Sequence, residues 1–177
     1  MATKKNIPLL NLIFFSLLGA ILIVAQISLR LLPNIELVSI LIFIYAKYYR
    51  FYSLLPVYIF IFIEGIIYGF GLWWLCYLYV WLILVLLTII LTSKITLKNT
   101  LLDSLICAIT IGFFGLIFSF LFSISYMITI DFKSGITCFI SGIIFDIIHF
   151  VSNFIIGMVL YIPLNKLFNN FPFLKAN

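Results

Sequence analysis

The chain has 177 residues, of which 66% are hydrophobic and only 8% are charged, and its formal net charge is +5. A soluble domain of this length needs far more polar residues to cover its surface, so the composition excludes that class. Several apolar runs approach the ~20 residues that cross a bilayer core. The sequence therefore predicts an all-α, multi-pass integral membrane protein embedded in a lipid bilayer, and the basic excess points to membrane orientation and not to nucleic acid.

Six apolar segments follow one another along the chain and predict a compact bundle of six transmembrane helices in a single domain, 1–177. They are approximately 7–31, 34–47, 53–70, 73–92, 100–128 and 136–162. The first segment is too long for the apolar core of a signal peptide, so we take it as a membrane helix. The second segment is short, with about 14 residues and a rise of about 21 Å. The sequence leaves open whether this segment spans the bilayer fully.

Loop charges predict the orientation of this bundle. With six spans and an inner N-terminus, eight Lys and Arg residues fall on the cytoplasmic side and two on the outer side. The cytoplasmic residues are Lys4, Lys5, Lys47, Arg50, Lys94, Lys98, Lys166 and Lys175, and the outer residues are Arg30 and Lys133. Because inner loops of membrane proteins are enriched in basic residues, both termini are expected in the cytoplasm.

Four of the predicted helices and one loop place polar or aromatic residues in the outer half of this bundle. Intramembrane carboxylates are costly and usually face a bundle interior or a water-filled cavity, so their convergence predicts a binding site that opens to the outside. Asp146 and His149, at i and i+3 of one helix face, would form its floor. The candidate binding residues are Gln26, Asn34, Glu36, Glu64, Tyr68, Trp74, Tyr77, Trp81, Asp146, His149 and Asn153.

Each of these groups also has a structural interpretation, which the sequence leaves open. The alternatives are an interfacial aromatic belt for Trp73 and Trp74, an ion pair between Glu64 and Arg30, a helix-dipole contact for Glu36 and a hydrogen bond between Asp146 and His149.

Known catalytic and cofactor motifs are absent from the sequence. It contains no phosphate-binding P-loop, no Gly-x-Ser-x-Gly and no His-Glu-x-x-His, and it has a single histidine. Asp146 and His149 would bind a metal only with Glu36 or Glu64 as further ligands. We therefore expect neither an enzyme nor a resident metal or cofactor.

Four blocks of the sequence resemble a poorly characterised subgroup of the substrate-binding S components of energy-coupling factor (ECF) transporters. These blocks are PNIELVS at 33–39, EGIIYGFGLWW at 64–74, YLYVW at 77–81 and FDIIHFVSNF at 145–154. The chain length, the six expected helices and the lack of an ATPase motif are similar to that family.

The resemblance implies a receptor in the bacterial plasma membrane that captures a vitamin-like micronutrient from outside. It would work with a transmembrane coupling protein (T component) and two cytoplasmic ATPases, which hydrolyse ATP. The loop around Pro33 and Asn34 would form part of a lid. Family members often carry two alanines four residues apart on the first helix for contact with the coupling protein. Here Ser16 and Ala20 have that spacing, and Gly19 widens the small patch.

Two other functions are compatible with the sequence. A membrane scaffold of the cell-shape and cell-wall machinery, similar to MreD, has a comparable length and apolar composition. A small enzyme acting on lipid head groups would use Asp146 and His149 as acid and base. If the chain is a receptor, the three acids around one histidine favour a neutral or cationic ligand with hydrogen-bond donors.

Overall fold

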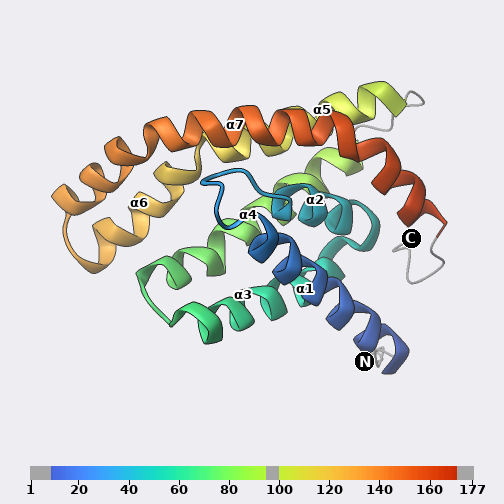
Figure 1. Ribbon diagram of the computed structural model, residues 1–177, viewed down its shortest axis with the longest axis horizontal. Helices are drawn as coiled ribbons and strands as arrows, with labels where there is room; N and C mark the ends of the chain where they lie inside the picture. Colours follow the sequence, from blue (N-terminus) through green and yellow to red (C-terminus); the bar gives the residue numbers. More distant parts are fainter. Residues whose placement is uncertain (1–8, 95–99, 171–177) are drawn as a thin grey trace.

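The structure is a computed structural model that describes residues 9–94 and 100–170, and every regular element in these ranges is a helix (Figure 1). The elements are α1 (Leu9–Leu29), α2 (Val38–Tyr49), the 3-10 helix η1 (Arg50–Ser53), α3 (Leu54–Tyr68), α4 (Leu72–Lys94), α5 (Thr100–Leu116), α6 (Phe118–Thr129) and α7 (Phe132–Asn169). The first two residues of the predicted segment 7–31, together with Lys4, Lys5, Lys98 and Lys175, lie outside the described residues.

Five stretches of the described chain are long and apolar enough to cross a membrane, which confirms the prediction of an all-helical membrane protein. They are Leu9–Leu29, Val38–Tyr68, Leu72–Lys94, Thr100–Thr129 and Phe132–Asn169. The second stretch contains two α-helices that run in opposite directions (Figure 1). The reversal occurs at Arg50, whose φ of 53° ends α2.

Two of the predicted boundaries are wrong because local backbone geometry overrides the apolar pattern. The second helix was expected from residue 34 but begins at Val38, since Asn34 has a φ of 59° and cannot continue a right-handed helix. The last helix was expected from residue 136 but begins at Phe132, because the Asp131 side chain accepts a hydrogen bond of 2.6 Å from Ser134 N and caps the helix.

The fifth predicted segment, 100–128, divides into α5 and α6 at Ile117. Both parts pack along α7, which has 38 residues and a length of about 57 Å. Because this length exceeds the ~30 Å hydrocarbon core of a bilayer, part of α7 either tilts strongly or extends beyond the core. The predicted end at 162 is also wrong, since α7 continues through Pro163 to Asn169.

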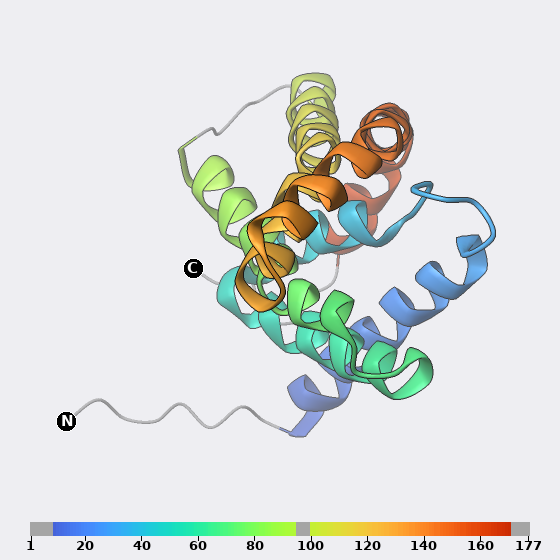
Figure 2. The ribbon, with the colours of Figure 1, turned by 90° about the vertical axis from the view of Figure 1, so that its left-hand side faces the viewer.

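The short helix α2 lies at the centre of the molecule. Figure 2 shows α5 and α7 side by side on one side of α2, with α1 and α3 on the other side. Nine of the 12 residues of α2 are buried, including Phe43 and Tyr45. The two-helix layer of α5 and α7 is held close by small residues: a Cβ at Gly157 would lie only 2.6 Å from Ala108 Cα.

A polar cluster joins three helices where α2 ends. Lys47 Nζ lies 3.7 Å from Asp103 Oδ2 of α5 and donates to Tyr161 Oη and, at 2.9 Å, to Asn165 Oδ1 of α7. Nearby, the Arg50 guanidinium donates to the Ile89 carbonyl at 3.1 Å, near the end of α4. These contacts fix the C-terminal end of α2, which lies at the opposite end of the bundle from the loop 30–37.

Candidate functional site

Two adjacent cavities lie beneath and beside the loop 30–37, which joins α1 to α2. The first has a volume of about 140 Å³ and the second about 430 Å³. Gln26, Arg30 and Tyr77 line both cavities, so the two are direct neighbours. A volume of about 10–15 Å³ on this measure holds one water, so even the smaller cavity holds several non-hydrogen atoms of a ligand.

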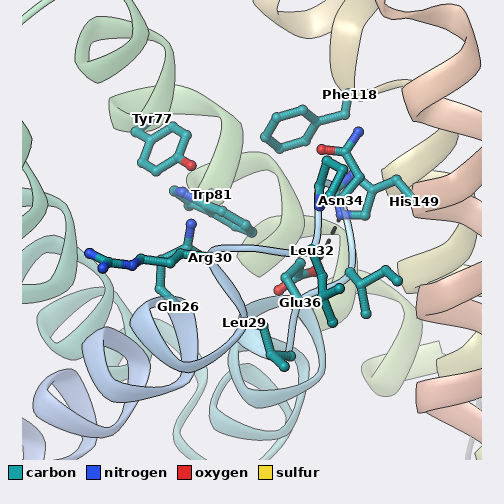
Figure 3. A pocket seen from close by; sticks show the side chains of 12 residues that line it. Gln26, Leu29, Arg30, Leu32, Asn34, Glu36, Tyr77, Trp81, Phe118 and His149 are labelled. Carbon is teal, nitrogen blue, oxygen red and sulfur yellow. Dashed lines mark hydrogen bonds and ion pairs between the residues drawn. The ribbon is translucent and has the colours of Figure 1, made fainter.

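The first cavity is enclosed by α1, the loop, α4, α6 and α7 (Figure 3). Its lining residues are Gln26, Leu29, Arg30, Leu32, Pro33, Asn34, Ile35, Glu36, Tyr77, Trp81, Phe118 and His149. The second cavity is lined by Gln26, Arg30, Leu31, Glu64, Tyr68, Trp73 and Tyr77.

The loop is attached to α7 at two points. Glu36 Oε1 lies 3.3 Å from His149 Nε2, and Ser152 Oγ donates to the Asn34 carbonyl at 2.8 Å. The second carboxylate oxygen of Glu36 accepts from Ser39 N at 2.8 Å, in the first turn of α2. Glu36 therefore both caps α2, as its structural interpretation expected, and ties the loop to α7.

Burial of Glu36 by itself raises the pKa of its carboxyl group. The hydrogen bond and charge of His149, together with hydrogen bonding to Ser39, outweigh this effect and hold the pKa below the ordinary 4.5. The folded loop thus favours the ionised carboxylate. Its stabilising contribution is complete above about pH 4.5 and is lost as the pH falls through the lower folded-state value.

We expect the loop to loosen on acidification. Amide hydrogen exchange of residues 30–37, corrected for the intrinsic pH dependence, should accelerate below about pH 4.5. In Glu36→Gln the amide oxygen still accepts from Ser39 N but does not titrate, so exchange in this loop should lose its acid dependence. Equal acid dependence in both proteins would show that another group controls the loop.

Aromatic rings form a continuous wall along α4. The ring centroids of Trp73 and Tyr77 are 5.3 Å apart and those of Tyr77 and Trp81 are 5.5 Å apart, both edge-to-face. Across the first cavity, the Phe118 ring meets the His149 ring at 5.1 Å. Figure 3 shows Tyr77 and Trp81 beside Gln26 and Arg30, with Phe118 and His149 opposite. Such a wall can bind a planar or apolar ligand body.

Three buried polar atoms among the lining residues have no hydrogen-bond partner within the described chain. They are Glu64 Oε1, Trp81 Nε1 and His149 Nδ1. Glu64 is 3% exposed and Trp81 is 2% exposed. Buried polar atoms in folded proteins are nearly always paired, so these three are positioned to meet a ligand or ordered water. Three further unpaired buried atoms, Ser39 Oγ, Tyr49 Oη and Asn153 Oδ1, belong to residues that line neither cavity.

The structure brings together eight of the predicted site residues. Gln26, Asn34, Glu36, Tyr77, Trp81 and His149 line the first cavity, and Gln26, Glu64, Tyr68 and Tyr77 line the second. The ion pair between Glu64 and Arg30, the structural alternative for Glu64, does not form in the described chain, although both residues line the second cavity.

Three predicted site residues lie elsewhere. Asp146 accepts hydrogen bonds from Ser119 N at 3.1 Å and Ser119 Oγ at 2.7 Å, at the start of α6. Asn153 Nδ2 donates to the Ile111 carbonyl of α5 at 3.3 Å, and Trp74 Nε1 donates to the Ile61 carbonyl of α3 at 3.0 Å. These side chains connect helices and do not line either cavity.

The predicted small-residue surface on α1 is also only partly available. Ser16 and Ala20 are exposed, but Gly19 is buried against α3, where an added Cβ would lie 2.8 Å from Ile59 Cγ2. Gly19 therefore allows α1 and α3 to approach each other and is not part of an outer surface.

The sequence reasoning missed two aromatic members of the site, Phe118 and Trp73, as well as Arg30. Phe118 gave no signal because it lies in a run of apolar residues. Trp73 was considered only as part of an interfacial aromatic belt, whereas its neighbour Trp74 was among the candidate binding residues.

The lining offers hydrogen-bonding, charged and stacking groups, among them the paired Glu36 and His149. In the described part of the chain, no group of three or more His, Cys, Asp and Glu residues is arranged to hold a metal ion. Comparison with protein-family models, with curated proteins and with solved structures gives no match to this chain.

Proposed function

We propose that this protein is the substrate-binding S component of an ECF-type importer, which captures a small vitamin-like micronutrient on the outer side of a bacterial plasma membrane. The observation that carries the proposal is the pair of adjacent cavities with buried, unpartnered Glu64 and Trp81 atoms, beside a loop that hydrogen bonds hold in place. A receptor needs such a preformed site, which a purely structural scaffold does not.

The proposed topology has six membrane crossings, with α2 and α3 as separate crossings and both termini in the cytoplasm. Two features support it. Successive helices reverse direction, except that α6 continues the direction of α5, so that α1 begins and α7 ends at the same side of the molecule (Figure 1). Lys47, Arg50, Lys94 and Lys166 lie near helix ends on that side, whereas Arg30 and Lys133 lie near the opposite ends, as the positive-inside rule requires.

In this proposal the chain itself hydrolyses no ATP. A transmembrane coupling protein and two cytoplasmic ATPases drive uptake, and the exposed Ser16 and Ala20 of α1 offer a small-residue contact for the coupling protein. The chain acts by binding, without a cofactor of its own.

Native mass spectrometry of the gently purified protein, followed by identification of small molecules after denaturation, tests the proposal. We expect one bound metabolite per chain. Its occupancy should fall at least about tenfold in Trp81→Phe, which keeps an aromatic ring at this position but removes the buried N–H donor. Affinity purification from the native cell should also recover the coupling protein and ATPases.

A matched control is Trp74→Phe, because Trp74 donates to the Ile61 carbonyl and lines neither cavity. It should keep the metabolite. A protein that stays empty against a vitamin panel and recovers cell-wall synthesis proteins would overturn the receptor and favour the MreD-like scaffold.

A further inference from the structure

We infer that the second cavity binds the positively charged group of an organic cation, an amine or a quaternary ammonium, with the Glu64 carboxylate as its counter-ion. The inference rests on the proposed receptor function and specifies the chemical class of its ligand. It derives from the placement of one buried acid among aromatic rings.

Glu64 is the acid of the site whose charge is left uncompensated. It lies on α3, is 3% exposed and lines the second cavity. Its Oε1 has no hydrogen-bond partner, and no described Lys, Arg or His forms an ion pair with it. A buried carboxylate in a membrane protein is costly unless it meets a cation. By contrast, the Glu36 carboxylate already meets His149 and Ser39 N.

Aromatic rings complete the site around this carboxylate. Tyr68, Trp73 and Tyr77 line the same cavity, and the rings of Trp73 and Tyr77 are in edge-to-face contact. A carboxylate combined with several aromatic faces favours an ammonium or trimethylammonium group, because the rings attract a cation and tolerate its methyl groups. An anion would be repelled by both the carboxylate and the electron-rich ring faces.

Arg30 is the one Lys or Arg among the described residues that line the cavities, and it does not compensate Glu64. Its side chain is exposed and forms no ion pair. A guanidinium at the mouth can remain in water, so it does not preclude a cation deeper in the cavity. In the adjoining first cavity, the free Trp81 Nε1 donor requires an acceptor. The ligand should therefore carry a cationic group at one end and a hydrogen-bond acceptor on its body.

Three probes that share a phenyl ring and a short chain test the charge preference: phenethylamine is a cation, 2-phenylethanol is neutral and 3-phenylpropionate is an anion. Their affinities are measured by tryptophan fluorescence of the full chain in lipid nanodiscs near neutral pH. We expect phenethylamine to bind at least about tenfold more tightly than 2-phenylethanol, and the anion to bind most weakly. In Glu64→Gln, which preserves the side-chain shape, the cation should lose this advantage.

Asp131→Asn is the matched control. It removes one negative charge from an exposed position, and asparagine caps a helix as well as aspartate does. It should retain the full preference for phenethylamine. Tighter binding of the anion, a cation preference that survives Glu64→Gln, or no binding of phenethylamine at millimolar concentration would each overturn the inference.

These outcomes are separable from those of the receptor proposal. A protein that prefers the anionic probe yet purifies with a metabolite and the importer subunits would remain a receptor with a different ligand class. A protein with a Glu64-dependent cation preference that purifies without those subunits would keep its cation site and lose the assigned transport role.

Discussion

Replacing Gly157 with valine is expected to lower the free energy of unfolding by about 3 kcal/mol, with a corresponding fall in Tm of about 6–12 °C. A Cβ at this position would lie 2.6 Å from Ala108 Cα and 3.1 Å from Ala108 N. Because these are backbone atoms, no rotamer change relieves the clash, and α5 and α7 must separate. Thermal unfolding in detergent, followed by circular dichroism, measures the effect.

Val159→Leu is the matched control, since it also enlarges a side chain of α7 but at a position that is 64% exposed. Its Tm should stay close to that of the wild-type chain. If Gly157→Val also left the Tm unchanged, the close approach of α5 and α7 would not contribute to stability. The contact between α5 and α7 also affects the site, because α7 carries His149, which lines the first cavity.

Apolar patterning predicted the helices well wherever polar residues bound an apolar run. Helix α4 was expected over 73–92 and spans Leu72–Lys94, because Gly71 and the polar Ser93 and Lys94 mark its ends. The break between α5 and α6 could not be predicted in this way. Ile117 lies between two apolar neighbours, two residues after Gly115 and two residues before Ser119. The start of α6 is stabilised by Asp146 from a helix that follows later in the chain.

The depth of polar residues in the membrane predicted part of the site. It did not predict which neighbouring element each side chain faces around its helix. Glu36 and His149 were expected in the same region, and the structure places them 3.3 Å apart. Asp146 and His149 are three residues apart and therefore differ by about 60° around the axis of α7. That angle is enough for Asp146 to face α6 while His149 faces the loop. The sequence of α7, which is apolar around much of its circumference, does not reveal which neighbour lies on which side.

The polar cluster at the far end of α2 was not predicted, because loop charges were interpreted only as signals of orientation. Lys47 was assigned to the cytoplasmic side, and Asp103 was not among the predicted site residues. Their 3.7 Å contact depends on the packing of α2 against α5 and α7, which pairs residues distant in sequence. A basic residue at a helix end can thus mark orientation and also hold helices together.

Replacing Asp146 with alanine is expected to lower the free energy of unfolding by about 2 kcal/mol while leaving the affinity for phenethylamine within about twofold of the wild-type value. The carboxylate is 2% exposed and accepts from both the amide and the hydroxyl of Ser119, so its loss leaves two donors unpaired at the start of α6. Neither cavity is lined by Asp146. Chemical unfolding and the fluorescence titration, made on the same preparation, measure the two quantities.

Asp146→Asn provides the control, because its amide oxygen still accepts a hydrogen bond from Ser119, and it should recover part of the lost stability. The outcome decides between two roles for an acid deep in a membrane helix. If Asp146→Ala weakened phenethylamine binding at least tenfold with unchanged stability, Asp146 would be a ligand contact, as the sequence first suggested. If stability alone falls, Asp146 serves to hold α6 against α7, and Glu64 remains the acid whose buried charge is uncompensated without a ligand.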